Sequence, residues 1–304
     1  MQENKIEYSD LLTDKRIQKI FSISADEILG DTASFDLYYR GTMWFFAEAV
    51  EHGLDKRTPA IKKTGELILK SYQVDTGGFT LHWKPRAAVS CRTGDMIRYL
   101  IMAGFNDSRV KNGIQWIVDN QRHDGGWLHC PLTVYKDFLL LSLFNRSGKY
   151  LHREKDSAVK SCFYGTYACL NALILYPDKS ESIQESILRG CEFILNHRIF
   201  KTTDNNPIQP RFGWNKNFSL LGYPVLSQFD ILYGLLTAAK AGLINDSRTG
   251  EAFNLLMSKQ NLDGTWNLEI AATGMLFGNN KRAPVGKPNK WVTLNAVRLL
   301  QYVS

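Results

Sequence analysis

The sequence predicts an all-α protein in which about five to six helix pairs form a ring, with one helix of each pair inside and the other outside. Three observations support this prediction. One motif recurs four times along the 304 residues, apolar helices alternate with amphipathic ones, and no shift in composition separates two domains. Repetition at a fixed period means that each unit buries its apolar face against the next one.

The repeated motif is clearest in the copy that contains Gln121 and Trp127. A small residue lies eight positions before the glutamine, a glycine four positions after it and an aromatic residue two positions further on. The small residue lets a neighbouring helix approach, the glutamine amide satisfies backbone groups at the helix end, and the glycine permits a sharp turn. The copies are Gly65/Gln73/Gly77/Phe79, Gly113/Gln121/Gly125/Trp127, Ala252/Gln260/Gly264/Trp266 and a degraded one, Gly190/Phe193/Arg198.

Two kinds of helix alternate along the chain. Helices over 34–51, 90–104, 161–175, 227–242 and 290–303 are apolar nearly all round, and each except the last begins at a serine. Helices over 57–72, 107–121, 181–198 and 246–260 are amphipathic, and the segment 10–21 is available as a fifth member of this set. The apolar set is expected inside and the amphipathic set outside. Gly53, Gly104 and Gly242 mark helix ends.

A single domain is expected over residues 1–304, and the segment 130–160 interrupts the repeat. That segment is expected to contain an extra helix near 134–144. The chain is 44% apolar and 22% charged, as is usual for a soluble globular protein. Its most apolar run, Met96 to Phe105, is far shorter than the roughly 20 residues of a membrane span, and its first ten residues are polar. We therefore expect neither a transmembrane helix nor a signal peptide.

The cysteine content indicates where the protein is located, and the charge distribution indicates which partners it binds. Five cysteines without dense spacing do not make a disulfide scaffold, which favours a reducing, cytoplasmic location. The net charge of +7 is spread along the chain, and no basic run is longer than two residues. An ordinary solvated surface is expected, and no nucleic-acid partner.

The Gln-to-Gly-to-Trp pattern resembles the QW repeat of squalene-hopene and oxidosqualene cyclases, which protein prenyltransferase beta subunits share loosely. The resemblance covers residues 57–266. It implies an α/α toroid whose inner helices line a central cavity, an apolar isoprenoid-like substrate and peripheral contact with a membrane. The acidic motifs of these enzymes, Asp-x-Asp-Asp and the Asp-Asp-x-x-Asp of terpene synthases, are absent from this sequence. Whether the chain is an enzyme is left open, because one fold hosts many functions.

Cysteines near the starts of inner helices suggest a zinc site. Cys91 and Cys162 hold equivalent positions in consecutive inner helices, and Cys130 lies in the loop between them. Helix N-termini favour thiolates, and three thiolates with His129, or else His82, are compatible with zinc. Cys162 resembles a zinc-binding cysteine of prenyltransferase beta subunits, whose other ligands do not carry over. The alternative is that each cysteine is a small buried apolar residue, which is also what we expect of Cys169 and Cys191.

Three acids near the starts of inner helices are candidates for chemistry. We predict that Asp95 and Asp230 act as acid-base or substrate-orienting groups, and that Asp36 contributes to substrate binding. The alternative is that each compensates or caps the N-terminus of its helix. Arg92, with Arg98, is expected to receive an anionic head group or, equally, to pair with Asp95.

Aromatic residues fill the inner helices. Rings around a dry cavity bind isoprenoid chains and stabilise cations, although core packing explains them equally well. The substrate-binding candidates among them are Tyr39, Trp44, Tyr164, Tyr167, Phe229, Tyr233 and Trp291.

Three functions compete at this point. The first is an enzyme that acts on an apolar, isoprenoid-like substrate in a central aromatic-lined cavity, with zinc or acid assistance. The second is a non-catalytic toroid that binds a ligand or a protein. The third is a zinc-thiol enzyme that modifies peptides, since lanthionine cyclases also pair an α/α toroid with zinc, and the His129-Cys130 pair resembles theirs. The substrate, the reaction type, an obligate protein partner and the oligomeric state stay open.

Overall fold

The computed structural model describes residues 42–80, 88–128, 160–208, 217–223, 225, 229–271 and 284–303. The predicted all-α class is confirmed. The apolar helices are α4 (Thr42–Glu51), α6 (Ser90–Met102), α9 (Phe163–Leu175), α11 (Ile231–Lys240) and α13 (Lys290–Leu300). The amphipathic helices are α5 (Pro59–Ser71), α7 (Ser108–Asp119), α10 (Glu181–Asn196) and α12 (Gly250–Ser258), the last preceded by the 3-10 turn η4 (Ser247–Thr249). The helices predicted within 10–21 and 134–144 lie outside the described residues.

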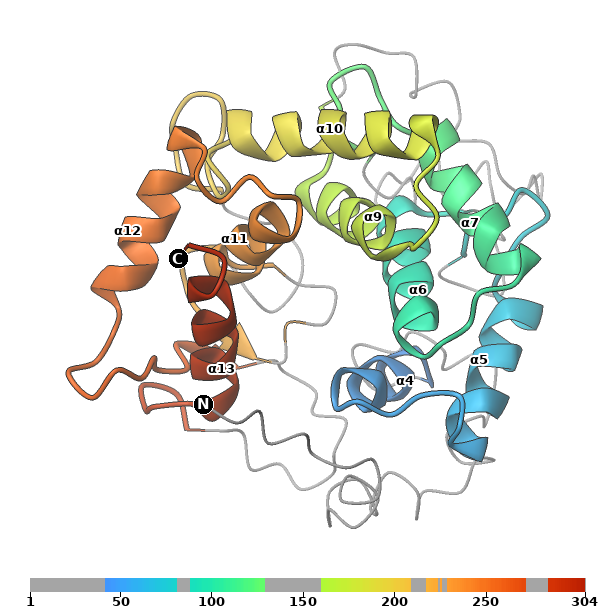
Figure 1. Ribbon diagram of the computed structural model, residues 1–304, viewed down its shortest axis with the longest axis horizontal. Helices are drawn as coiled ribbons and strands as arrows, with labels where there is room; N and C mark the ends of the chain where they lie inside the picture. Colours follow the sequence, from blue (N-terminus) through green and yellow to red (C-terminus); the bar gives the residue numbers. More distant parts are fainter. Residues whose placement is uncertain are drawn as a thin grey trace, which may run out of the picture.

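The two sets of helices occupy different layers. In Figure 1, α5, α7, α10 and α12 run along the periphery, and the other helices lie inside them. Each outer helix packs on the inner helix that precedes it, α5 on α4, α7 on α6, α10 on α9 and α12 on α11, and α7 also packs on α9. The inner helices pack in chain order, α4 on α6, α6 on α9, α9 on α11 and α11 on α13. The core fills the space between the two layers.

The last described helix contacts the residue that follows α4. His52, the residue after α4, lies edge-on to Trp291 in α13, with 5.2 Å between the ring centroids. The residue that follows α4 therefore contacts α13, the last described helix.

In the first two copies of the motif, the glutamine joins an outer helix to the next one, whereas Gln260 bonds to a carbonyl of its own turn at 3.2 Å. Nε2 of Gln73 donates to a carbonyl in its own turn at 2.8 Å and to the carbonyl of Arg109 in α7 at 2.7 Å. Gln121 makes the same two bonds, to its own turn and to Ser186 of α10, each at 2.8 Å. The predicted role of this amide at the helix end is confirmed, and the bond to the following helix extends it.

The other motif positions also act as predicted. A Cβ on Gly113 would lie 2.2 Å from the side chain of Ile97 in α6, so a larger residue there would require this side chain to move. Gly125 has φ +85°, and a Cβ there would lie 2.2 Å from the carbonyl oxygen of Arg189. The indole N–H of Trp127 donates to a carbonyl in α7 at 2.7 Å, which holds the ring over the helix end.

Two predicted helix starts were wrong. Helix α9 begins at Phe163, with Cys162 rather than Ser161 before it as N-cap. Helix α11 begins at Ile231, and its N-cap is Asp230, whose φ of −145° and ψ of 175° are extended. No helix can run through an extended residue, so the predicted start at Ser227 was too early. Ser227 itself lies outside the described residues.

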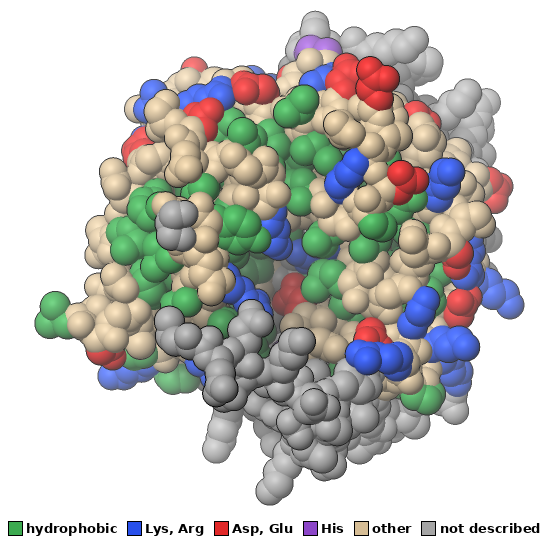
Figure 2. Space-filling view, in the orientation of Figure 1, with side chains coloured by type: hydrophobic (Ala, Val, Ile, Leu, Met, Phe, Trp, Pro, Cys, Tyr) green, Lys and Arg blue, Asp and Glu red, His purple; other side chains and the backbone are tan. Residues whose placement is uncertain are grey.

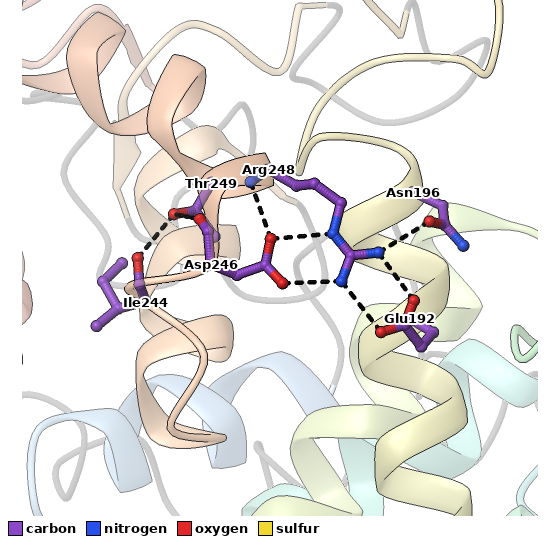
Figure 3. Close-up of polar contacts among 6 residues, drawn as sticks. All are labelled: Glu192, Asn196, Ile244, Asp246, Arg248 and Thr249. Carbon is purple, nitrogen blue, oxygen red and sulfur yellow. Dashed lines mark hydrogen bonds and ion pairs between the residues drawn. The ribbon is translucent and has the colours of Figure 1, made fainter.

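A second interaction that joins outer helices, made by an arginine, was not predicted. Arg248 donates to both carboxylate oxygens of Glu192 in α10, at 2.8 and 3.1 Å, and to both oxygens of Asp246, at 2.9 and 2.8 Å (Figure 3). Arg109 pairs in the same way with Glu66 of α5 and with its own N-cap, Asp107. The signal was visible in the sequence, because Asn-Asp-Ser-Arg stands at both 106–109 and 245–248. Arg248 lowers the pKa of Asp246 from 3.8 to about 2.

Replacing Arg248 with lysine is expected to lower the free energy of unfolding by up to about 1 kcal/mol. The positive charge stays, but a single ammonium cannot donate to two carboxylates as the guanidinium does. The effect is small because Arg248 is 33% and Glu192 58% exposed. Urea unfolding of Arg248→Lys would measure it, with Arg298→Lys as control. Equal effects of the two substitutions would show that the bonds of Arg248 to Glu192 do not stabilise the protein.

Two short strands were not predicted either. β1 (Gly222–Tyr223) pairs in parallel with β2 (Ile270–Ala271), so the segment before α11 is joined to the segment after α12. Within the described ranges, the helices are all too short or too polar to cross a membrane.

Candidate functional site

Four of the predicted aromatic residues form one cluster between α9 and α11. Tyr167 stacks on Phe229 with 3.9 Å between centroids, and Tyr233 lies 6.3 Å from each of them. Phe218, which was not predicted, lies 4.6 Å from Phe229 and 5.5 Å from Tyr164. We call these five residues the aromatic cluster. Tyr164 and Tyr233 are partly exposed, whereas the other three are almost completely buried.

Trp44 and Trp291 lie apart from this cluster. Trp44 is buried, and the guanidinium of Arg92 lies 4.8 Å from its ring centroid. Trp291 stacks on Tyr223 with 5.4 Å between centroids and meets His52 edge-on. The structure therefore brings together four of the seven predicted aromatics and places two elsewhere. The seventh, Tyr39, lies outside the described residues, as does Asp36.

The two predicted catalytic acids have different surroundings. Asp230 is buried, and both of its oxygens accept backbone N–H groups, from Gly222 at 2.9 Å and from Tyr233 at 2.8 Å. Burial raises the pKa of Asp230 to about 6, against the lowering effect of these bonds. Capping, the alternative considered for this residue, accounts for its position. Asp95 is also buried, and its carboxylate lies 3.7 Å from Arg92, so the ion-pair alternative for Arg92 is confirmed.

The described cysteines do not make a complete zinc site. Cys91 and Cys162 are partly exposed, while Cys130 and His129 lie outside the described residues. Burial raises the pKa of Cys162, although backbone N–H groups of α9 oppose the rise, so the expected shift toward thiolate is not seen. In the part of the chain that the structure describes, no three His, Cys, Asp or Glu side chains are placed to hold a metal ion. The packing role expected for Cys169 and Cys191 is confirmed by their burial.

A group of charged residues between the inner helices was largely missed by the sequence analysis. Arg98 is 5% exposed, and it donates to the hydroxyl of Tyr233 at 2.6 Å and to that of Tyr99. Its guanidinium lies 3.5 Å from the carboxylate of Glu51, which also accepts from Tyr99 at 2.8 Å. Arg98 thus connects α4, α6 and α11, and through Tyr233 it touches the aromatic cluster.

Two further cations lie on α11, which Arg98 contacts through Tyr233, and on α13, which packs on α11. Lys240, the last residue of α11, and Arg298 of α13 are exposed to solvent. Even so, the pKa of Lys240 is lowered, first by the protein around it and then by the positive charges of Arg98 and Arg298, against an opposing effect of Glu51. We call Glu51, Arg98, Lys240 and Arg298 the charged cluster.

Figure 2 shows one face of the molecule. The face it presents is hollowed at its centre, between the inner helices, and Lys or Arg side chains lie in the hollow with an acidic one.

Next to the charged cluster, α4 buries a second glutamate. Glu48 is 6% exposed, and burial, with the negative charge of Glu51 adding to it, raises its pKa to about 9. At neutral pH this side chain is therefore a neutral carboxylic acid.

A spacing in the sequence could have located the charged cluster. Lys240 follows Tyr233 by seven residues and Arg298 follows Trp291 by seven, and this interval returns to the same face of a helix. The predictions concentrated on the N-terminal ends of the inner helices, whereas these charges lie in the C-terminal halves. Arg98 was considered as an anion-binding residue, but only beside Arg92.

No protein-family model matches the sequence, and no curated protein matches it. The resemblance to QW-repeat proteins therefore rests on the residues of the repeat.

Proposed function

We propose that this chain is an α/α toroid that binds an apolar, isoprenoid-like molecule at its centre and acts on it as an enzyme. The toroid is supported by the alternation of inner and outer helices and by the contact of α13 with His52. The binding function is carried by one observation, the aromatic cluster between two inner helices. Ring faces bind alkenyl chains through apolar burial, and Tyr164 and Tyr233 are the members that are reached from solvent.

Binding is tested with farnesol, an uncharged isoprenoid alcohol, added to the full chain while tryptophan fluorescence is measured. Tyr164→Ala is expected to raise the dissociation constant at least about tenfold, because losing an aromatic contact costs on the order of 1.5 kcal/mol. Tyr302→Ala is the matched control, since Tyr302 is an exposed tyrosine in the turn after α13. Failure of the parent chain to bind farnesol, or the same loss in both variants, would count against the proposal.

Catalysis needs a separate test. The protein would be incubated with farnesyl diphosphate or with squalene, and the organic extract of this mixture would be compared with the extract of a mixture that contains heat-denatured protein. A product found only with native protein supports an enzyme. Asp95 is then the candidate acid-base or orienting group, and Asp95→Asn is expected to reduce turnover while farnesol still binds. Unchanged turnover in Asp95→Asn would remove Asp95 from the mechanism.

The non-catalytic toroid is a second candidate, favoured by the position of Asp230. Because both oxygens of this carboxylate are engaged by backbone N–H groups, one of the two predicted acids has a complete structural role. Binding of farnesol without any product would support this candidate. Zinc at Cys91, Cys130, Cys162 and His129 stays a prediction. Cys91 and Cys162 alone do not fit a zinc site, so no step is derived through the metal.

A further inference from the structure

Arg98 donates to two tyrosine hydroxyls, and these hydroxyls differ in what accepts their own protons. The hydroxyl of Tyr99 accepts from Arg98 and donates to the carboxylate of Glu51 at 2.8 Å, so both of its roles are filled within the protein. The hydroxyl of Tyr233 accepts from Arg98 at 2.6 Å, and among the described residues no acceptor lies within hydrogen-bond distance of it. An arginine side chain has donors only, so Arg98 cannot accept the proton of Tyr233.

The side chain of Tyr233 is held in place at both ends. Its backbone N–H donates to Asp230, the N-cap of α11, at 2.8 Å, and its hydroxyl is bonded to Arg98, which is buried. Burial raises the pKa of Tyr233, against the lowering effect of Arg98, so the hydroxyl keeps its proton at neutral pH. Tyr233 therefore presents an O–H donor at a fixed position.

This donor belongs to the aromatic cluster. The ring of Tyr233 lies 6.3 Å from the rings of Tyr167 and Phe229, and its side chain is partly exposed. The hydroxyl of Tyr167, in contrast, donates to the backbone carbonyl of Ile199 at 3.0 Å. A polar hydrogen without an acceptor in the protein is satisfied by solvent or by a ligand. A molecule that packs on the ring of Tyr233 therefore has a donor at the edge of its binding surface.

We infer that the hydroxyl of Tyr233 donates a hydrogen bond to an uncharged oxygen of the bound molecule, which is thus an isoprenoid-like alcohol, aldehyde or ketone. Arg98 is the positioning residue for this hydroxyl. The inference rests on the proposed binding of an apolar molecule by the aromatic cluster. The oxygen is uncharged because Glu51, 3.5 Å from the guanidinium, already offsets the charge of Arg98, and burying a further, unpaired charge costs free energy.

The competing explanation is that the hydroxyl of Tyr233 serves only as an acceptor for the buried guanidinium of Arg98. The two explanations differ in what removal of the hydroxyl does. An acceptor for Arg98 affects the stability of the protein and acts equally on the binding of every ligand. A donor to the ligand affects only those ligands that carry an oxygen.

Two probes with corresponding carbon chains separate these explanations. Farnesol carries a hydroxyl and β-farnesene is a hydrocarbon, and tryptophan fluorescence of the full chain gives the dissociation constant of each. Tyr233→Phe keeps the ring and removes the hydroxyl. It is expected to raise the constant of farnesol about three- to tenfold, the usual effect of losing one hydrogen bond, and to leave that of β-farnesene within about twofold.

The matched control is Tyr167→Phe, which removes a hydroxyl from the same cluster. That hydroxyl is bonded to Ile199, so this variant is expected to change the constants of farnesol and β-farnesene by the same factor. Thermal unfolding of each variant checks its fold.

The positioning role of Arg98 is tested on the ratio of the two dissociation constants. Arg98→Lys keeps the charge, but one ammonium does not reproduce the fixed fork of donors that holds both hydroxyls. This variant is expected to lower the preference for farnesol over β-farnesene. Combined with Tyr233→Phe, it is expected to lower the preference no further than Tyr233→Phe alone, because the two residues act through one hydrogen bond. A further loss in the double variant would contradict the positioning role.

Two results would overturn the hydrogen bond, and they differ in what they say about the proposed function. If the parent chain binds neither farnesol nor β-farnesene, the proposed binding function fails, and this inference fails with it. If the parent chain binds both, and Tyr233→Phe changes the two constants equally or not at all, the inference fails while the proposed function stands.

Discussion

Replacing Gly94 with alanine is expected to lower the free energy of unfolding by about 3 kcal/mol or more. Gly94 lies in the middle of α6, where this helix packs against α9. A Cβ at this position would lie 2.3 Å from the carbonyl carbon of Ala168 and 2.4 Å from the backbone nitrogen of Cys169. These are backbone atoms of another helix, so no side chain can rotate away, and the two helices must separate. Overpacking of this kind costs typically 1–3 kcal/mol, and more where the backbone has to move.

Urea unfolding followed by circular dichroism would measure the effect of Gly94→Ala. Gly250→Ala is the matched control, because Gly250 begins α12 and a Cβ there would meet nothing within 4 Å. Alanine favours the helix over glycine, so this control is expected to gain up to about 1 kcal/mol. A loss of less than about 1 kcal/mol in Gly94→Ala would show that α6 and α9 are not in such close contact.

Replacing Glu48 with glutamine is expected to stabilise the protein by roughly 3 kcal/mol at pH 7. The pKa of Glu48 is raised from 4.5 to about 9 in the folded state. Below pH 4.5, both the folded and the unfolded chain hold the proton. Between pH 4.5 and 9, only the folded chain holds it, so the free energy of unfolding falls as the pH rises, by about 1.4 kcal/mol per pH unit. Glutamine resembles the neutral acid and carries no such proton.

The measurement is the difference in free energy of unfolding between Glu48→Gln and the parent chain across pH 4.5 to 8. The gain is expected to be near zero at pH 4.5 and to grow with pH. Glu66→Gln is the control with the opposite sign, because Arg109 lowers the pKa of the half-exposed Glu66. That substitution is expected to cost less than about 1 kcal/mol at neutral pH. A difference for Glu48→Gln that does not vary with pH would show that Glu48 is ionised in the folded protein.

The helices and their layers could be predicted because the repeat fixes them locally. The turn glycines Gly77, Gly125 and Gly264 all have a positive φ, and the indoles of Trp127 and Trp266 make equivalent bonds to the preceding helix. Helix starts were less predictable. Ser227 and Asp230 are both plausible N-caps in the sequence, and the extended backbone of Asp230 identifies it as the N-cap of α11. Fold-level prediction therefore succeeded where a pattern repeats and failed where a single residue had to be chosen.

The candidate site was harder to predict, because its residues belong to different repeats and meet only through packing. Propensity places Tyr167 and Phe229 on inner helices, but not in contact with each other. The charged cluster was missed for a similar reason, since Lys240 and Arg298 look like ordinary basic residues in the last turns of two helices. Only the packing of α11 on α13, and the bond of Arg98 to Tyr233 in α11, place these charged residues on inner helices that contact one another.

The contact between His52 and Trp291 also bears on how the chain reaches its native state. Trp291 belongs to α13, the last described helix, so it leaves the ribosome after all the other described helices. Until then, the end of α4 and the side of α11 that α13 covers stay open to solvent. Bringing His52 and Trp291 together closes a long loop of chain, and the entropy cost of this closure grows only slowly with the number of residues in the loop. Contacts offset this cost only when α13 docks. The joining of α4 to α13 is therefore a late step of folding during synthesis.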